Sequence, residues 1–412
     1  MLTNFKELED YVLSRNMKKR IALANAHDEP ALSAVVHAHR KGVVDGTLVG
    51  KKNEIIAMLH DMGENESDYE IVDFDGEELE AAKIAVQLVR EGKADIPMKG
   101  ILQTSNFARA ILNKETGLIP KGGRRLVSQC GIFEYEGRFI MITDAAINIA
   151  PDVETQIGIV ENALPVARAL GVECPKVAVL SAVENVTDKM PSTVTAREIA
   201  ERGVEGCVIS GPLALDGAIS MESVKHKAIK DPVAGQADIL LVPFIEIGNV
   251  LYKACSYIAG KTMASTICGA SCPVIITSRA DTPDSKYYSI LMAVLRCLKA
   301  EHMATSADYL TFVLEQLPPL GVVRSRKMFG EYMAYLHEKP VLLVCDNTVF
   351  VKKLPEVREL LAQADCGAPY PGAKEHYILD IENRDLLHAV IPVLEAATPV
   401  PAPRKKKEKN HD

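Results

Sequence analysis

The stretch Arg20–Arg40 (RIALANAHDEPALSAVVHAHR) indicates how most of the chain folds. Ile21–Ala24 is a short apolar run, typical of a buried strand. Asp28-Glu29-Pro30 then signals a helix start with proline in the first turn. One apolar face at helical spacing follows, made by Leu32, Val35 and Val36. A buried strand running at once into an amphipathic helix predicts an α/β unit.

The same alternation continues to about residue 300. We expect further strands at Thr47–Val49, Glu70–Phe74, Lys176–Leu180, Gly206–Ser210, Asp238–Pro243 and Pro273–Thr277. We expect helices near Lys52–Asp61, Glu77–Glu91, Asp152–Leu170, Thr195–Arg202, Gly248–Ile258 and Ser285–Glu301. The strands are nearly continuous apolar runs, as in sheets covered on both faces, so the pattern predicts α/β with mainly parallel sheets.

Two stretches depart from this alternation. Arg125–Asp144 predicts longer strands with a turn at Glu136-Gly137, and we interpret it as the switch between two α/β lobes. Pro165 lies inside a helical pattern and should kink or split that helix.

The pattern changes to α+β after Met303, which predicts a domain boundary near residue 302. A short helix marked by residues 309–317 precedes two hairpins, with turns at residues 338–340 and 346–347. Helices are expected near Glu356–Ala364 and Arg384–Ala397. Residues 400–412 carry Arg404-Lys405-Lys406-Lys407 after a proline-rich spacer and predict a disordered basic tail, with nucleic-acid contact as the alternative.

Composition narrows the class of protein. The net charge of −8 over 412 residues argues against non-specific nucleic-acid binding by the whole chain. The nine cysteines form no C-x-x-C pair, which favours free thiols in a reducing compartment. The N-terminal residues lack the apolar core of a signal peptide, and no apolar run reaches about 20 residues. These features predict a cytoplasmic protein without a membrane span.

Polar residues follow four of the predicted strands, where open α/β sheets bind ligands. The loop Thr277-Ser278-Arg279-Ala280-Asp281 offers a hydroxyl, a guanidinium and a carboxylate, which suit a phosphate clamp or, equally, a helix cap. The other candidates are Gly248 with Asn249, Thr104 and Asn106 with Arg109 one turn later, and Asp144 with Asn148. Ordinary helix capping is the alternative interpretation for each of these three.

Several catalytic motifs are absent from the sequence. There is no G-x-G-x-x-G after the first strand, no G-x-x-x-x-G-K-[ST] and no G-x-S-x-G. The ten histidines include no H-x-x-x-H pair. These absences argue against dinucleotide, P-loop, esterase-type and zincin sites.

Linked motifs in order resemble the phosphate acetyl/butyryltransferase family from about residue 18 to residue 300. They are Ala24–Glu29 (ANAHDE), Asp144–Pro151 (DAAINIAP), Lys176–Val183 (KVAVLSAV), Met190–Thr193 (MPST), Gly211–Gly217 (GPLALDG), Asp238–Pro243, Gly248-Asn249 and the Ser278-Arg279 loop. The compact length and the TSRAD form look more like the butyryl branch than the acetyl branch.

The resemblance implies a two-lobed fold related to isocitrate and isopropylmalate dehydrogenases, with lobe I at about 1–143 and 273–302 and lobe II at about 144–272. It implies a homodimer that converts acyl-CoA and phosphate reversibly to acyl phosphate and coenzyme A. Coenzyme A is then a substrate, and no metal, cofactor or covalent acyl-enzyme is expected.

The resemblance also suggests roles for single residues. Arg279 and Arg109 would clamp phosphate, and Ser278 would hydrogen-bond charge developing in the transition state. In the acetyl branch the proposed base is an aspartate seven residues after the motif serine, but Ser285 stands there in this chain. Asp281 is our first choice of base, and Asp284 is the second.

Residues 303–399 resemble the TfoX N-terminal domain family, which is associated with competence regulation. The motifs are Arg326–Tyr332 (RKMFGEY), Val349–Lys353 (VFVKK) and Pro369–Lys374 (PYPGAK). Arg324, Arg326 and Lys327 suggest either a binding patch or a solvated strand face.

Three functions are compatible with these patterns. The first is a phosphate butyryltransferase, with phosphate acetyltransferase as its near alternative. The second is a non-catalytic regulatory protein that senses acyl-CoA or acyl phosphate. The third, a decarboxylating dehydrogenase of the same fold, would need a metal-binding carboxylate set that the sequence does not offer.

Overall fold

The protein is described here from a computed structural model covering residues 1–120, 124–278, 281–302, 307–317, 321, 323–328, 331–369 and 373–400. The chain divides into two compact units, Met1–Cys297 and Leu298–Asp412. Arg279 and the basic tail, about which the sequence made predictions, lie outside the described residues.

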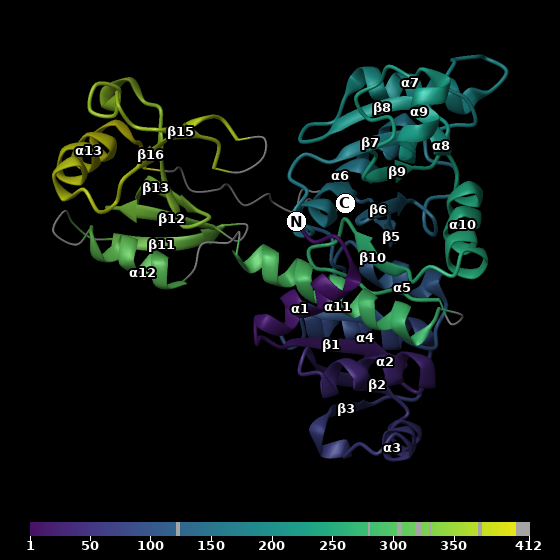
Figure 1. The fold of residues 1–412 in the computed structure, drawn as a ribbon. Coiled ribbons are helices and arrows are strands. Elements are labelled where there is room, and N and C mark those ends of the chain that lie inside the picture. The colour runs from purple at the N-terminus through teal and green to yellow at the C-terminus, as the bar shows by residue number, and fades with distance from the viewer. Residues whose placement is uncertain are drawn as a thin grey trace, which may run out of the picture. The chain divides into compact units, whose positions relative to one another are not determined.

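The first sheet of the first unit is entirely parallel, with strand order β3-β2-β1-β4. Its strands are β1 (Lys19–Ala24), β2 (Val44–Gly50), β3 (Glu70–Asp73) and β4 (Ile96–Lys99). The helices of this lobe are α1 (Phe5–Ser14), α2 (Glu29–Arg40), α3 (Lys52–Asp61), α4 (Glu78–Arg90) and α5 (Thr104–Ile111). This is the strand–helix alternation that the sequence predicted, and it follows the chain from purple to blue in Figure 1.

The second sheet has six strands in the order β10-β5-β6-β9-β7-β8. They are β5 (Ser128–Tyr135), β6 (Arg138–Thr143), β7 (Lys176–Leu180), β8 (Val208–Leu213), β9 (Ile239–Leu241) and β10 (Ala264–Cys268). Its helices are α6 (Val153–Ala169), α7 (Pro191–Arg202), α8 (Leu215–Ile219), α9 (Met221–Lys227) and α10 (Ile245–Lys253), which continues as a π-helical turn (Ala254–Ile258).

Strands β5 and β6 form the hairpin predicted around Glu136-Gly137. Strand β5 also pairs antiparallel with β10, and β6 pairs parallel with β9. The hairpin is therefore part of the second sheet. We expected lobe I to extend to about residue 143. The second sheet begins earlier, at Ser128, because β5 and β6 both pair with its strands.

The segment before the TSRAD loop connects the two sheets. Ile275 forms a parallel bridge with Met98 of β4, while Val274 forms an antiparallel bridge with Ile267 of β10. The N–H of Ile275 donates to the carbonyl oxygen of Pro97 at 3.0 Å, and the N–H of Lys99 donates to that of Ile275 at 3.0 Å. The segment predicted as a strand, Pro273–Thr277, thus forms only isolated bridges. These bridges fix the position at which the following loop begins.

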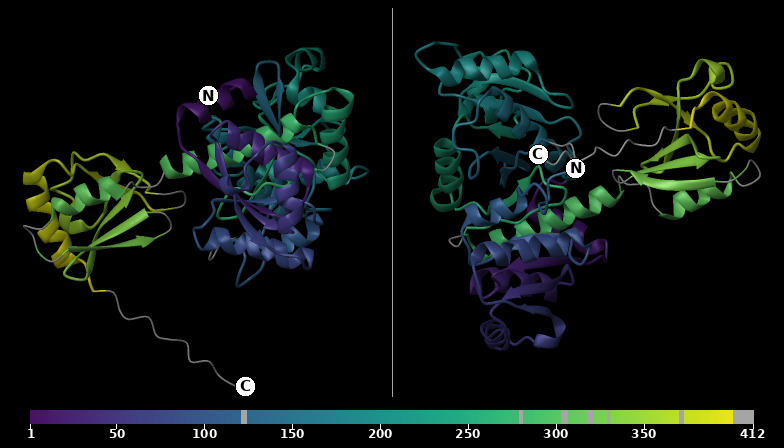
Figure 2. Two further views of the ribbon diagram at one scale, coloured as in Figure 1. Left: turned by 90° about the horizontal axis from the view of Figure 1, so that it is seen from below. Right: turned by 180° about the vertical axis from the view of Figure 1, so that it is seen from behind.

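Helix α11 (Pro283–His302) follows the loop and runs between the two sheets in both Figure 1 and Figure 2. Helix α6 continues across Pro165, so the predicted split does not occur. Proline removes one backbone hydrogen bond, but Ile159, Val160, Ala163 and Val166 bury this part of the helix. Packing holds the helix together despite the proline.

The second unit contains one antiparallel sheet with strand order β11-β12-β13-β14-β16-β15. Its elements are α12 (Ala307–Glu315), β11 (Val323–Met328), β12 (Glu331–Leu336), β13 (Lys339–Cys345), β14 (Thr348–Lys352), β15 (Cys366–Gly367), β16 (His376–Leu379) and α13 (Arg384–Ala397). Both predicted hairpins are confirmed, although the first turns one residue earlier, with His337 and Glu338 at positive φ.

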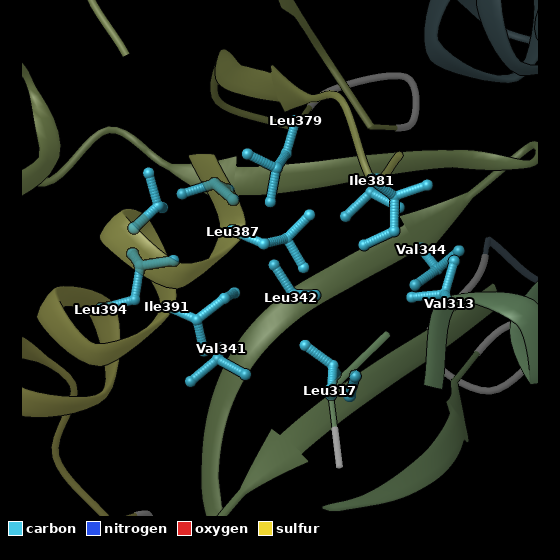
Figure 3. Close-up of a cluster of buried hydrophobic side chains, with 14 of the residues drawn as sticks. Val313, Leu317, Val341, Leu342, Val344, Leu379, Ile381, Leu387, Ile391 and Leu394 are labelled. Atoms are coloured by element: carbon cyan, nitrogen blue, oxygen red, sulfur yellow. The ribbon is translucent and has the colours of Figure 1, made fainter. Parts of the chain in front are cut away.

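Helices α12 and α13 supply apolar side chains to the core of this unit. Figure 3 shows Leu387, Ile391 and Leu394 of α13 pointing toward Leu342 of β13. The helix predicted at Glu356–Ala364 was wrong, because a 3-10 turn (Pro355–Val357) and further turns occupy this stretch. Most of its backbone bonds join residues three apart, while Val357 and Leu361 still reach the core.

Candidate active site

A cavity of about 890 Å³ lies in the first unit where strand ends from the two sheets meet. Its walls come from the end of β4, the start of α5, helix α10, residues 276–278 and Asp281, with single residues from β5 and β10. This is the position at which α/β folds bind ligands.

Four of the residues predicted from sequence line this cavity together. They are Thr104, Asn249, Ser278 and Asp281, which come from three separate segments of the chain. Thr104 is the first residue of α5, whose free backbone amides favour an anion. Asn249 donates from Nδ2 to the carbonyl oxygen of Ala145 at 3.2 Å. The fold therefore brings together residues that lie more than 170 positions apart in sequence.

Asp281 closes the loop on itself. Its Oδ2 accepts a hydrogen bond from the N–H of Ser278 at 2.7 Å, and its own N–H donates to the Ser278 carbonyl oxygen at 3.1 Å. Burial raises the pKa of Asp281, while this hydrogen bond and the positive charges of Lys286 and Lys99 lower it in part. The carboxyl group is thus held at the cavity with a pKa above its ordinary value.

Asp144 and Asn148 do not line the cavity, although Ala145 and Ala146 between them do. Asp144 is buried, and its two carboxylate oxygens accept from the N–H groups of Gln129, Ala146, Ile147 and Asn148 and from Asn148 Nδ2, at 2.6–3.1 Å. Asn148 Nδ2 also donates to the Val127 carbonyl oxygen at 2.9 Å. Burial raises the pKa of Asp144, and the hydrogen bonds from Ala146, Gln129 and both donors of Asn148 oppose that shift. The pair shapes the backbone that carries Ala145 and Ala146 into the cavity wall.

Gly248 allows α10 to approach this same turn. A Cβ added there would lie 2.7 Å from the Asp144 carbonyl oxygen and 2.9 Å from Ala145 Cα. Those distances leave no room for any larger residue. Gly248 is therefore a packing position that sets Asn249 at the cavity.

Arg109 and Asn106 do not line the cavity, although both belong to α5. The Arg109 side chain is exposed, and Asn106 Nδ2 donates to Glu78 Oε2 at 2.9 Å. The same Glu78 oxygen accepts from the N–H of Gln103 at 2.8 Å. Glu78 thereby fixes the start of α5, and Asn106 serves that contact.

Lys99 is a buried cationic residue of the cavity that the sequence did not predict, and Lys253 of α10 also lines the cavity. Lys99 ends β4, is buried, and donates from Nζ to the carbonyl oxygens of Gly100 and Leu102 at 3.2 and 3.1 Å. A lysine directly after an apolar strand was the available signal, at Ile96–Lys99. Its ammonium group lies close enough to Asp281 to lower the pKa of that carboxyl group.

Lys286 supports the loop from the other side. Its side chain is buried, and its Nζ donates to the Asp281 carbonyl oxygen. Burial lowers the pKa of Lys286, and the charges of Asp281 and Asp28 oppose that shift. Asp281 and Lys286 both line a second cavity of about 460 Å³ that also includes His37 and Asp284.

Ser285 plays a structural part at the position where a base had been considered. It is buried, its Oγ accepts from the N–H of Met263 at 3.2 Å, and its N–H donates to Thr282 Oγ1 at 3.1 Å. These bonds fasten the start of α11.

Arg324 in the second unit has a local partner. Its guanidinium donates from Nε to Glu338 Oε1 at 2.7 Å and lies over the Tyr335 ring, 4.1 Å from the centroid. Arg326 is exposed, and the side chain of Lys327 lies outside the described residues. The pairing of Arg324 favours a solvated strand face over a binding patch.

The described residues contain neither a metal-binding cluster nor a helix suited to a membrane. No group of three or more His, Cys, Asp or Glu side chains in that part of the chain could hold a metal ion. Within the same ranges, no helix has the length and apolar character needed to cross a membrane.

Residues 77–294 match the family described as phosphate acetyl/butaryl transferase, and residues 315–382 match the TfoX N-terminal domain. The phosphate butyryltransferase of Clostridium acetobutylicum is 44% identical over 301 residues, which cover 72% of this chain and 98% of that protein. The phosphate acetyltransferase of Thermotoga maritima is 37% identical over 287 residues, or 69% of this chain and 97% of that protein.

The comparison with solved structures finds the same kind of enzyme as the sequence comparison. The branched-chain phosphotransacylase from Enterococcus faecalis V583 superimposes with a TM-score of 0.61 at 35% identity, over 68% of this chain and 98% of that one. The chain therefore belongs to the phosphate acetyl/butyryltransferase family, and it is a phosphate acyltransferase that also carries a TfoX N-terminal domain.

Proposed function

We propose that the 890 Å³ cavity of the first unit is where this phosphate acyltransferase works, and that butyryl-CoA is its preferred acyl donor. The observation that carries the proposal is that Lys99, Ser278 and Asp281 line one cavity beside the start of α5. A fixed cation, a hydroxyl and a carboxyl group are what the reaction needs at one place.

Phosphate binds at the end formed by Lys99 and α5. The Lys99 ammonium group attracts an anion, and the positive end of the α5 dipole at Thr104 and Ser105 adds to this, although Glu78 Oε2 already accepts from the N–H of Gln103. Arg279, next to Ser278 in sequence, remains our candidate for a second cation. Holding phosphate against the thioester can supply about 7–11 kcal/mol of the barrier by proximity alone.

A phosphate oxygen then attacks the thioester carbonyl carbon. Negative charge develops on the carbonyl oxygen, and the Ser278 hydroxyl donates a hydrogen bond to it. The carbon–sulfur bond breaks as the tetrahedral species collapses, and the products are acyl phosphate and the thiolate of coenzyme A.

Asp281 moves the proton of the thiol. In the direction that consumes acyl phosphate, its carboxylate takes the proton from coenzyme A as the sulfur attacks. A free thiol has a pKa of about 8.5, so a nearby base increases the reactive fraction at neutral pH. The raised pKa of Asp281 makes it a stronger base than an exposed aspartate.

The assay is phosphate-dependent release of free thiol from acetyl-CoA, butyryl-CoA and longer acyl-CoA compounds. We expect the highest kcat/KM with butyryl-CoA, following the 44% and 42% identity to two phosphate butyryltransferases. A higher kcat/KM with acetyl-CoA would contradict the butyryl preference. Binding of acyl-CoA without any turnover would favour the sensing role instead.

We further propose that the first unit forms a homodimer through the outer face of α10. Val250 is 67% exposed, Ile247 is 47% exposed, and Ile258 in the following π-helical turn is 87% exposed. Several large apolar side chains exposed along one helix and its following turn are unusual on a surface that stays in water. Sedimentation should give a dimer for the wild type and a monomer for Val250→Asp, with Met17→Asp as the exposed apolar control. A monomeric wild type would refute the proposal.

A further inference from the structure

Gln129 is a buried side chain of the cavity that the proposed chemistry does not yet use. It lies on β5 and is 5% exposed. Its Nε2 donates to Ser265 Oγ at 2.9 Å. Its Oε1 is buried and has no hydrogen-bond partner. An unsatisfied buried acceptor costs about 1–3 kcal/mol, so its presence at a cavity points to a ligand that supplies the donor.

Hydrogen bonds fix the backbone of Gln129 and the serine that holds its side chain. Its N–H donates to Asp144 Oδ1 at 3.1 Å, and its carbonyl oxygen accepts from Thr143 Oγ1 at 2.9 Å. Ser265 is itself buried, and its N–H donates to Ser289 Oγ at 2.8 Å. Ser265 Oγ therefore orients the Gln129 amide, from a strand whose own backbone is fixed.

A flat aromatic surface lies next to the amide. A Cβ added at Gly131 would be 2.6 Å from Tyr252 Cδ2 and 3.5 Å from Gln129 Nε2. The Tyr252 ring therefore packs directly on Gly131, beside the Gln129 amide. Tyr252 and Gln129 both line the cavity. This wall places an unpaired acceptor, Gln129 Oε1, in the same side chain as an amide nitrogen beside an aromatic ring.

The substrates of the proposed reaction differ in what they can donate. The acyl chain has no N–H or O–H group, and phosphate belongs with the cation at Lys99. The pantetheine arm of coenzyme A is thin and largely apolar, and it carries two secondary amides. Its first amide is separated from the sulfur by only two methylene groups, so it stays near the reacting sulfur.

We infer that Gln129 Oε1 accepts a hydrogen bond from the pantetheine amide N–H nearest the sulfur, with the adjoining methylene groups packed on the Tyr252 ring. This inference rests on the proposed function, because it takes coenzyme A as the occupant of the cavity. Gln129 then fixes the depth to which the thiol enters and brings the sulfur to Asp281.

The first test is equilibrium binding of coenzyme A, which needs no turnover. Gln129→Met removes the acceptor and keeps a long side chain. We expect about 10-fold weaker binding, which corresponds to about 1.4 kcal/mol. Gln156→Met is the matched control, because Gln156 is equally buried and its Oε1 also has no partner, but it does not line the cavity. Unchanged affinity in Gln129→Met would overturn the inference.

The second test compares two minimal donors, S-butyryl-N-acetylcysteamine and its analogue with an ester oxygen in place of the amide N–H. We expect the wild type to prefer the amide compound about 10-fold in kcat/KM, and Gln129→Met to show no preference. An equal preference in both proteins, or a raised KM for phosphate instead, would overturn the inference. If no acyl-CoA were turned over but Gln129→Met still weakened coenzyme A binding, the proposed function would fail and the inference would stand.

Discussion

The two units of this chain place their polar side chains differently. Among the described residues, the buried polar and charged side chains lie before residue 298, with Thr398 as the exception. The core of the second unit is made of aliphatic side chains from α12, α13 and the sheet. Buried polar groups lower stability unless each is satisfied, so their concentration in one unit indicates where chemistry takes place.

We expect mutations in the two units to have different effects. Changing a polar residue that lines the cavity should affect catalysis more than folding, and changing a core residue of the second unit should do the reverse. Four variants test this distinction.

Asp281→Asn should have the largest effect. Asparagine keeps an acceptor for the Ser278 N–H but cannot take a proton, so kcat toward acyl phosphate and coenzyme A should fall about 10²–10⁴-fold. The wild-type rate should rise with pH through a pKa above the ordinary aspartate value, since the ionised form is active, and the variant should lose this acid limb. Asp284→Asn, an exposed change in the same turn, is the control. A normal pH profile in Asp281→Asn would exclude it as the base.

Ile391→Ala should destabilise the second unit by about 2–5 kcal/mol, because it removes a fully buried side chain from the aliphatic core. Hydrogen exchange of peptides covering residues 331–351 and 376–394 in the full chain would report the change. Leu360→Ala, at a 40% exposed position, should cost under about 0.5 kcal/mol. A fall in kcat that matched the loss of stability would contradict the separation of the two units.

Lys99→Met should lower kcat/KM for phosphate about 10²-fold, by loss of a fixed positive charge at the cavity. Removing this charge should also raise the pKa of Asp281 and shift the acid limb to higher pH. Arg109→Met should change kcat/KM no more than about 2-fold, since an exposed charge contributes little. The opposite ranking would restore Arg109 as the phosphate clamp.

Asp144→Asn should give the smallest effect, about 1–3 kcal/mol of stability, because an amide nitrogen cannot accept the two hydrogen bonds from Asn148. The folded-state pKa of Asp144 is raised, so folding takes up a proton between its ordinary and its raised pKa. The stability advantage of the wild type should therefore shrink as pH rises through that window. Urea denaturation of both proteins across the acidic range measures it, and a growing advantage would contradict the assigned cause.

Much of the fold followed from local patterns in the sequence. Strand β7 and helices α3 and α13 have the predicted bounds, because each is a regular run with clear ends. The hairpin at Glu136-Gly137 also formed, but its place in the second sheet depends on pairing with β9 and β10, which are far away in sequence. The 3-10 turn after Leu354 replaced a predicted helix for a similar reason, since tertiary contacts of Val357 and Leu361 decide its path.

The site was predicted less evenly. Ser278, Asp281, Thr104 and Asn249 reach one cavity, as their positions after strands suggested. Arg109 is five residues after Thr104, which is about 140° around a helix of 3.6 residues per turn, so its side chain faces elsewhere. Lys99 and Gln129 were missed because a single lysine or glutamine in an apolar strand does not reveal whether its side chain will be buried at a cavity.

The backbone hydrogen bonds at Val274 and Ile275 provide a way to measure opening of the cleft during catalysis. The backbone N–H groups of Lys99 and Ile275 donate hydrogen bonds at the place where residues 274–275 connect the two sheets. Neither N–H can exchange with solvent unless these hydrogen bonds break. The hydrogen-exchange rates of these two N–H groups, with and without coenzyme A, would report how often the two sheets separate, and the protein would need no attached label. Slow exchange throughout turnover would mean that substrates enter a preformed cleft.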